Sequence, residues 1–350
     1  CIKKDLFIFL IIVYCGAILS STVLNKGEVF NVLVSSTDFS IMKLLTLCMA
    51  LTICFRKKTR VCYDILLRYY EVIIFLNLCT IVLFPGGMYS TGQNENYFLG
   101  FDNTHSVVFF FALGLAFLKD YIDDRNKFSG RTWVMIVLVH LNSILCMSSL
   151  TIIQLFLFDV FLIFKKVLKG RKLFNGYTLI AVNIAVTIFL LFFFSDKNVI
   201  LKYIIVNILG KDMTLTFRAY LWSDYVFPAI SENIVLGHGW GYENAYYYMH
   251  GYYHAHNQYL TDLYYGGIVM LAVLLLITVL VAKKLNEYKT TNTGYYLLVI
   301  FFVSMFHWNA ESMHLMMQLA TFCILYNYDY IVQLRVNSMT IKQNYKNEYY

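Results

Sequence analysis

Long apolar runs alternate with short polar connections along most of this 350-residue chain. The runs long enough to cross about 30 Å of hydrocarbon as helices are residues 6–24, 39–55, 69–84, 105–118, 132–147, 149–164, 176–194, 262–282, 295–309 and 313–330. Each must be helical in lipid, because unpaired backbone groups are costly there, and the alternation typical of a membrane β-barrel is absent. The pattern predicts an all-α polytopic integral membrane protein with about ten transmembrane helices.

Basic residues gather in every second connection between these runs. The clusters are Lys3-Lys4, Arg56-Lys57-Lys58 with Arg60, Lys119 to Arg131, Lys165-Lys166 to Lys172, Lys283-Lys284, and a tail with Arg335 and Lys342. The side richer in lysine and arginine is the cytoplasm, so we expect both termini there. The connections 25–38, 85–104, 148–149, 195–261 and 310–312 then face outward. This topology requires two helices within 132–164, because one long helix would reverse every later connection.

The chain therefore divides into four predicted parts. Residues 1–194 hold transmembrane helices 1–7, 195–261 form one large extracytoplasmic loop that carries the active site, 262–330 hold helices 8–10, and 331–350 are a cytoplasmic tail. Within 85–104, turn residues beginning at Pro85-Gly86-Gly87 predict a loop over the outer surface. Ile200, Ile204 and Ile208 recur every four residues and predict a short amphipathic helix in the outer interface.

Composition agrees with the membrane interpretation. Hydrophobic residues make up 59% and charged residues 14%, and the mean hydropathy is +0.61. The net charge of +7 does not indicate nucleic-acid binding, because the basic clusters follow membrane topology. The eight cysteines lie mostly in apolar runs without a CxxC pair, which favours packing over disulfides or metal binding. The chain starts at Cys1 without a methionine, and we expect further sequence upstream.

Arg218 is the first residue of chemical interest in the loop 195–261. It lies in the segment Phe217-Arg218-Ala219-Tyr220-Leu221-Trp222, whose aromatic residues would shield its contacts from water. A guanidinium there could hold a phosphate or diphosphate through bidentate hydrogen bonds. The alternative is a structural ion pair with Asp224 or Glu232.

A glycine series follows, in which Gly237, Gly239 and Gly241 alternate with His238 and Trp240. It does not match the GxGxxG nucleotide-binding pattern. Glycine instead permits a tight turn whose backbone N–H groups point at an anion or a sugar. The tyrosines after it suit stacking on sugar faces or an interfacial belt; they are Tyr242, Tyr246, Tyr247, Tyr248, Tyr252 and Tyr253.

Two histidines, His254 and His256, stand just before the eighth apolar run. A histidine at the membrane edge could transfer a proton or bind a diphosphate, and the alternative is a packing or capping role. A zinc site is not expected, because cysteine is absent from this loop and carboxylates are few. Glu311, in the outer turn between the last two runs, is an ionisable group at the same level.

In the order of these motifs, the chain resembles the O-antigen polymerase and ligase family, which includes Wzy-type polymerases of capsule synthesis. The family pattern is an arginine followed by a tryptophan, a Gly-x-Gly-x-Gly turn, and His-Asn-x-aromatic-Leu running into a glycine-rich span. It is met by Arg218, Trp222, Gly237 to Gly241, His256-Asn257-Gln258-Tyr259-Leu260 and Gly266-Gly267-Ile268. Weaker similarities are Tyr97-Phe98-Leu99-Gly100 and Glu311.

The chain departs from the family at the outer end of the fifth span. The family often has Ser-Arg-Thr or Ser-Arg-Gly there, whereas this chain reads Ser148-Ser149-Leu150-Thr151. The second phosphate-binding arginine of ligase-like members is therefore missing at that place. Lys197, Lys202 or Lys211 could supply the charge, and we include Lys211 among the candidate substrate-binding residues.

The resemblance implies a metal-independent, inverting glycosyltransferase of the integral-membrane C type (GT-C) that uses no cofactor. It would transfer a glycan from undecaprenyl diphosphate to the non-reducing end of another lipid-linked repeat unit, at the outer face of a bacterial cytoplasmic membrane. A flippase and a chain-length regulator are further expected partners. The candidate residues are His256 and Arg218 for catalysis, and Trp222, Gly237, Gly239, Gly241, Asn257, Tyr259, Glu311 and Lys211 for substrate binding.

Three other functions remain open at this stage. A ligase of the same family would transfer the glycan to a different acceptor. A flippase would move lipid-linked sugars, although the internal repeats and the charged or broken spans of many transporters are not evident here. A receptor or scaffold would use the outer loop only for binding.

Overall fold

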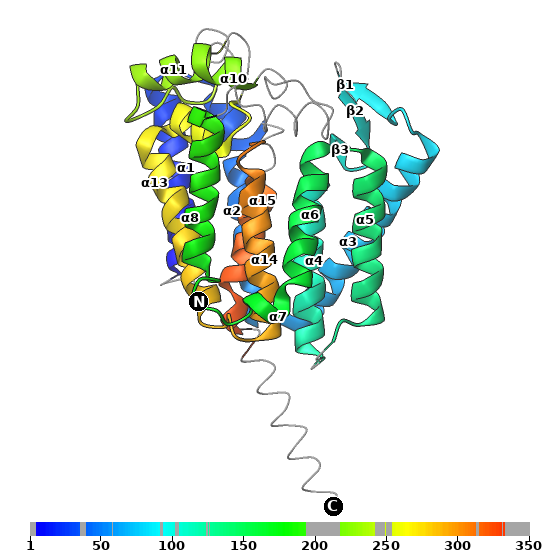
Figure 1. Ribbon diagram of the computed structural model, residues 1–350. Coiled ribbons are helices and arrows are strands. Elements are labelled where there is room, and N and C mark those ends of the chain that lie inside the picture. The colour runs from blue at the N-terminus through cyan, green and yellow to red at the C-terminus, as the bar shows by residue number, and fades with distance from the viewer. Residues whose placement is uncertain are drawn as a thin grey trace, which may run out of the picture. The chain divides into compact units, whose positions relative to one another are not determined.

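A computed structural model of the chain shows a helical protein (Figure 1). It describes residues 5–35, 40–57, 59–91, 94–101, 105–123, 125, 127–193, 218–241, 249, 254–312, 315–330 and 332. The predicted amphipathic helix around Ile204, the residue Lys211 and the tyrosines between 242 and 253 lie outside these residues.

Each predicted apolar run contains a helix. The long helices are α1 (Leu6–Leu24), α2 (Ile41–Lys57), α3 (Thr59–Leu83), α4 (His105–Ile122), α5 (Gly130–Cys146), α6 (Ser149–Ile163), α8 (Gly176–Ile188), α13 (Gln258–Asn286), α14 (Asn292–His307) and α15 (Leu315–Tyr326). Shorter helical pieces are α7 (Lys165–Leu168) and the π-helical turns η1 (Asn31–Ser35) and η3 (Phe189–Phe193). The expected helical class is confirmed.

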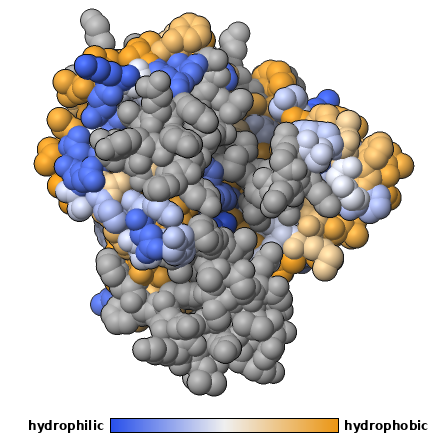
Figure 2. Space-filling view, turned by 90° about the horizontal axis from the view of Figure 1, so that it is seen from above, coloured by the Kyte–Doolittle hydropathy of each residue, from blue (hydrophilic) through white to orange (hydrophobic). Residues whose placement is uncertain are grey.

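Four of these helical segments are long and apolar enough to cross a membrane: Leu6–Leu24, Tyr63–Leu83, His105–Ile122 and Gln258–Asn286. Other apolar helices, such as α5, α6 and α14, are shorter. Large apolar side chains on the helices are exposed, among them Phe9 and Ile163. Figure 2 shows exposed apolar residues, in orange, along much of the edge of the view, beside hydrophilic ones in blue. Such exposure suits a multi-pass membrane protein, whose outer side chains contact lipid.

The segment 132–164 is two helices, as predicted. Helix α5 begins after Ser129, whose side chain accepts a hydrogen bond from the N–H of Thr132. It ends at Cys146, because Met147 takes a left-handed conformation with φ 52°. Helix α6 then starts at Ser149. The break agrees with the reversal of direction that the charge pattern requires.

The connection 85–104 contains a small antiparallel sheet that the sequence does not predict. Its strands are β1 (Tyr89–Thr91), β2 (Asn94–Tyr97) and β3 (Gly100–Phe101), paired in that order. Strands of two to four residues are too short to show the alternation by which strands are recognised. Pairing them satisfies backbone groups that a plain loop would leave to solvent.

Contacts between residues divide the chain into two compact units. The first takes its described residues from 1–46, 177–279 and 305–316, and the second from 47–176, 280–304 and 317–350. The described candidate residues of the loop, together with Glu311, belong to the first unit. That unit is therefore the one that positions the site.

Buried polar side chains connect the helical segments of the first unit. Asn183 on α8 donates from Nδ2 to the hydroxyl of Tyr259 on α13 at 2.7 Å and accepts from Asn309 at 2.7 Å. Tyr14 on α1 donates to Oδ1 of Asp262 on α13 at 2.8 Å. All five side chains are buried. Because a buried polar group is costly without a partner, these bonds favour one register of the helices.

Candidate functional site

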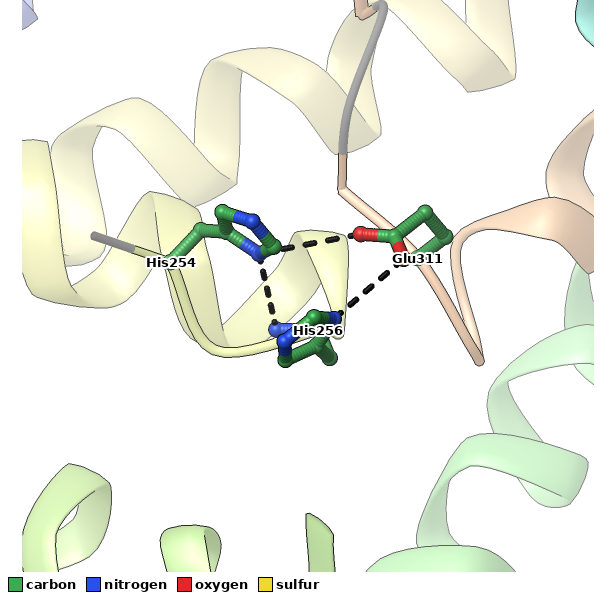
Figure 3. Close-up of side chains that lie close together, drawn as sticks. All are labelled: His254, His256 and Glu311. Carbon is green, nitrogen blue, oxygen red and sulfur yellow. Dashed lines mark hydrogen bonds and ion pairs between the residues drawn. The ribbon is translucent and has the colours of Figure 1, made fainter. Parts of the chain in front are cut away.

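Four ionisable side chains from three separate segments meet in the first unit. They are Arg218, His254, His256 and Glu311. Figure 3 shows both histidines facing the carboxylate of Glu311. Nδ1 of His256 lies 3.2 Å from Oε2 of Glu311, and Nδ1 of His254 lies 3.6 Å from Oε1. Nη2 of Arg218 lies 3.7 Å from Oε2.

Arg218 is placed by a helical segment with an irregular middle. The segment consists of α10 (Arg218–Leu221), η5 (Trp222–Val226) and α11 (Phe227–Glu232), and its junction residues keep helical dihedral angles. One turn after Arg218, the buried indole of Trp222 donates from Nε1 to the carbonyl of Ala255 at 2.7 Å. This bond ties the arginine segment to the residue between the two histidines. A π-helical turn of this kind is frequent at functional sites.

His256 is placed by the start of α13. Asn257, fully buried, caps that helix by accepting the N–H of Leu260 at 3.2 Å. Its Nδ2 also donates to the carbonyl of Asn309 at 3.4 Å. The φ of His256 is 47°, in the left-handed region that non-glycine residues rarely adopt. Such backbone strain is concentrated at functional sites in proteins generally.

Glu311 is placed by the turn between α14 and α15. Its N–H donates to the carbonyl of His307 at 3.0 Å, and its Oε1 accepts the N–H of Ser312 at 2.9 Å. The N–H of Gln258 donates to the carbonyl of Trp308 at 2.9 Å, which joins this turn to the start of α13. The carboxylate is almost completely buried, with its side chain 1% exposed.

Burial and neighbouring charges act in opposite directions on Glu311. Burial alone would raise the pKa of its carboxyl, but the hydrogen bond from His256 and the charges of His256, His254 and Arg218 lower the pKa well below its usual range. For Arg218, burial lowers the pKa, and the carboxylate of Glu311 raises it again. A guanidinium keeps its charge under such shifts. The site therefore holds a buried carboxylate beside a permanent cation.

The carboxylate also sets the tautomer of His256. A carboxylate can only accept, so Nδ1 of His256 carries the proton in that contact. In the neutral ring, Nε2 is then the basic nitrogen, and among the described residues it has no hydrogen-bond partner. The side chain is 30% exposed. A histidine held by a carboxylate at one nitrogen and open at the other is the arrangement of a general base.

Arg218 has N–H groups that are available to a ligand. A guanidinium carries five N–H groups, and the partner of Arg218 among the described residues is one oxygen of Glu311, at 3.7 Å. This distance is too long for a strong hydrogen bond. The side chain is 20% exposed, so an incoming anion can reach it in a partly dry environment. This arrangement suits a phosphate or diphosphate.

His254, His256 and Glu311 could also hold a metal ion. One ligand atom from each lies within 4.8 Å of the other two, and two histidines with a carboxylate suit Zn²⁺ or Fe²⁺. However, Arg218 lies close to the same carboxylate, and its charge would repel a bound cation. The geometry favours a hydrogen-bonded histidine–glutamate pair, and the expected absence of a metal stays a prediction.

Several predicted substrate-binding residues have structural contacts. Trp222, Asn257 and Tyr259 are buried and bonded to other parts of the unit, as described above. They hold the histidine segment in place. Their predicted contact with substrate is not tested by these contacts.

The glycine series packs against a break in α13. Gly267 interrupts that helix with φ 64°, and the carbonyls of Tyr264 and Tyr265 accept the N–H groups of His238 at 2.7 Å and Gly239 at 3.0 Å. Gly239 has φ 71°, and a Cβ there would lie 2.5 Å from Cα of Thr22. The turn therefore needs glycine for close packing.

The N–H groups of this turn are already used within the protein. Gly237 donates to the carbonyl of Asn233 at 2.9 Å, and Trp240 donates to Oγ1 of Thr22 at 2.9 Å. Gly237 is positioned in addition by the side chain of Asn25, which donates to its carbonyl at 3.0 Å. Gly241 is buried at the end of the series. For N–H groups 237–240, packing is the role that the structure shows, and binding of an anion or sugar by the turn stays a prediction.

The structure brings Arg218, His256 and Glu311 together and adds His254, to which the sequence analysis gives less weight. Among the described residues, Arg218 pairs with Glu311 and with neither Asp224 nor Glu232, the alternative partners considered from the sequence. Asp262, a buried carboxylate one turn into α13, is not among the site residues predicted from the sequence. An acidic residue at the start of an apolar run, close to the histidine motif, is the signal that could have identified it.

Comparisons of this chain with known protein families, with curated proteins and with solved structures find no match.

Proposed function

We propose that this chain is a polysaccharide polymerase that transfers a glycan from undecaprenyl diphosphate to the non-reducing end of another lipid-linked repeat unit. The observation that carries the proposal is the convergence of Arg218 and the His256–Glu311 pair. An anion-binding cation and an oriented base are what such a transfer needs. The long apolar helices support a membrane protein, which suits lipid-linked substrates.

The chemistry demands little beyond positioning. In the proposed step, the oxygen of the acceptor hydroxyl forms a bond to the anomeric carbon of the donor, while the bond from that carbon to the diphosphate oxygen breaks. The electron pair leaves with undecaprenyl diphosphate, and attack from the opposite face inverts the anomeric configuration. A diphosphate is already a good leaving group, so orientation and charge stabilisation supply most of the catalysis.

Each residue has one task in this step. Nε2 of His256 accepts the proton of the attacking hydroxyl, and Glu311 stabilises the imidazolium that forms. Arg218 holds the diphosphate while negative charge grows on it. No metal enters the step, because the guanidinium provides the positive charge.

The proposed location is the outer face of a bacterial cytoplasmic membrane, with both termini in the cytoplasm. The lysine- and arginine-rich connections predict that the termini are cytoplasmic and that the loop carrying the site faces outward. A cysteine at Ser231, exposed on α11, should react with an impermeant maleimide in whole cells of a variant without native cysteines. A cysteine at Lys172 should react only after lysis. The reverse labelling pattern would overturn this orientation.

The activity is tested with purified protein in liposomes that contain lipid-linked repeat units. The wild type should lengthen them and release undecaprenyl diphosphate, and R218A and H256A should each do so far more slowly. The control is E232Q, which removes an exposed carboxylate from the same helical segment as Arg218. Normal chain growth by R218A and H256A would reject the proposed site.

The product also separates the alternatives. A ligase would leave lipid-linked units unextended and transfer the glycan only when a different acceptor is supplied. A flippase would move the units across the bilayer without forming a glycosidic bond. Chain extension without any other protein supports a polymerase.

A further inference from the structure

A cavity lies beside the histidine–glutamate pair in the first unit. It combines an apolar wall with a few polar groups, which is the composition of typical small-molecule sites. The polar side chains that line it are His254, Gln258, Thr261, Asp262 and Ser312. His254 belongs both to this lining and to the candidate site. Ser312 also joins the two, because its N–H donates to the carboxylate of Glu311.

Three polar atoms in this lining are buried without a hydrogen-bond partner among the described residues. They are Oδ2 of Asp262, Oε1 of Gln258 and Oγ of Ser312. Folding rarely tolerates such groups, because an unpaired buried polar atom is costly. Their concentration around one cavity therefore indicates a ligand that satisfies them.

The carboxylate of Asp262 is held in one orientation. Its Oδ1 accepts from the hydroxyl of Tyr14 at 2.8 Å and from Nε2 of Gln258 at 2.6 Å. The amide orientation of Gln258 follows, because only its NH₂ group can donate to a carboxylate. Oδ2 of Asp262 and Oε1 of Gln258 are thus both acceptors. A ligand that pairs with both must bring donors.

The rest of the wall is aromatic and apolar. Trp240 and Tyr265 line the cavity, with their ring centroids 4.8 Å apart, and Ile18, Met270 and Leu315 complete it. A small inorganic cation would use the acceptor oxygens but not this wall. A pyranose ring has hydroxyl donors at its edge and C–H groups on its face, so it matches both parts.

We propose that this cavity binds one sugar ring of the acceptor repeat unit, with Asp262 and Gln258 accepting hydrogen bonds from its hydroxyl groups. The proposal rests on the proposed function and deepens it, because a sugar here would present a neighbouring hydroxyl to His256. Ser312 donates to or accepts from a further hydroxyl. Asp262 is then a determinant of acceptor specificity and takes no part in the proton transfer.

The first test measures binding without catalysis. Methyl pyranosides of glucose, galactose, mannose and N-acetylglucosamine are titrated against the protein in nanodiscs, and tryptophan fluorescence is recorded. We expect at least one of them to change the fluorescence saturably, and W240F to remove most of that change. The variant D262N, which replaces one acceptor oxygen by a donor NH₂ group, should weaken binding about tenfold, the loss of one strong hydrogen bond.

The matched control is T278V. Thr278 is also buried on α13, and among the described residues the partner of its hydroxyl is the carbonyl of Leu274, at 2.7 Å. T278V should therefore leave binding unaltered. Thermal melting shows whether each variant is folded. No saturable response to any of the four glycosides, or equal binding by D262N and the wild type, would overturn the proposal. A melting temperature raised by Na⁺ or Ca²⁺ only when Asp262 is present would replace the sugar with a cation.

The second test measures chain growth. D262N should raise KM for the acceptor about tenfold, with kcat and KM for the donor little changed. A loss confined to kcat would assign Asp262 to the chemical step instead, against this proposal. If R218A and H256A abolish growth but D262N keeps the wild-type KM, the sugar site fails and the proposed function stands. If R218A and H256A are fully active, the proposed function fails whatever D262N does.

Discussion

Two histidine–carboxylate pairs among the described residues, one in each compact unit, have nearly the same distance. Nδ1 of His256 lies 3.2 Å from Glu311, and Nε2 of His140 on α5 lies 3.1 Å from Asp159 on α6. Glu311 is 1% exposed at its side chain, whereas Asp159 is 38% exposed. The same two groups thus occur in a dry and in a half-exposed environment.

The two pairs differ more in the hydrogen bonding of the second nitrogen of each imidazole ring. Nδ1 of His140 faces the carbonyl of Ile136 at 2.8 Å, so both of its nitrogens have acceptors within the protein. Nε2 of His256 has no partner among the described residues. Both ring nitrogens of His140 are engaged within the protein, where the residue joins two helices. His256 instead keeps Nε2 available for a substrate. Proximity to a carboxylate therefore does not by itself identify a catalytic histidine.

The contacts of Arg131 with Glu71 and of Arg218 with Glu311 differ in the same way. Arg131 makes two hydrogen bonds to Glu71, the one from Nη2 at 2.7 Å. Arg218 only approaches Glu311, at 3.7 Å. Arg131 uses its guanidinium for a bidentate contact within the protein, whereas the guanidinium of Arg218 keeps N–H donors available for an anion.

The largest effect is expected from the histidines. H256Q keeps some hydrogen bonding but cannot accept a proton, so the rate of chain growth in liposomes should fall about 10²–10⁴-fold. H140Q should leave the rate largely unchanged. A rate for H256Q close to that of the wild type would show that His256 is not the base.

A smaller effect is expected from the arginines. R218K keeps the charge but loses the planar fork, and the rate should fall about 10- to 100-fold, the value of one or two charged hydrogen bonds. R131K, in the second unit, should not change chain growth at saturating substrate. If R218K is as active as the wild type, Arg218 acts only as a point charge. If R218A is also as active as the wild type, Arg218 does not bind the donor.

The carboxylates should differ in stability. E311Q removes a buried, fully engaged carboxylate and should lower the free energy of unfolding by about 1–3 kcal/mol at neutral pH, whereas D159N should cost at most about 1 kcal/mol. The depressed pKa of Glu311 in the folded state adds stability above its unfolded pKa of about 4.3. This stability is lost as pH falls through the folded pKa. Thermal melting should therefore show the gap between wild type and E311Q closing below about pH 4, and a gap independent of pH would contradict the pairing.

The smallest effect is expected at His254. H254Q should leave long chains largely intact, because Glu311 and His256 keep their contact without it. Treatment of the wild type with EDTA should not reduce chain growth. The alternative is a metal centre formed by His254, His256 and Glu311. It would be shown if EDTA abolishes activity, Zn²⁺ restores it, and H254Q lowers the rate as much as H256Q. His256 would then not be the general base.

Much of the helical framework is predictable from the sequence, because an apolar run in lipid must satisfy its backbone internally. The runs near 6–24 and 105–118 correspond closely to α1 and α4. The short sheet in 85–104 is missed, since its strands are too brief for a pattern. The glycine series has positive φ at Gly237 and Gly239, but its turn residues are 234–236, just before the series, and its packing against the break at Gly267 depends on distant carbonyls.

The sequence by itself determined the apolar helices and the residue types able to bind an anion or accept a proton, because these depend on composition and local order. Only the tertiary structure decided that Glu311 is the carboxylate that meets both His256 and Arg218. His256 and Glu311 lie 55 positions apart, and their contact results from how the turn after α14 bonds to the start of α13. No local pattern encodes that distance. The cavity beside Asp262 has the same origin, because it exists only between segments that packing brings together.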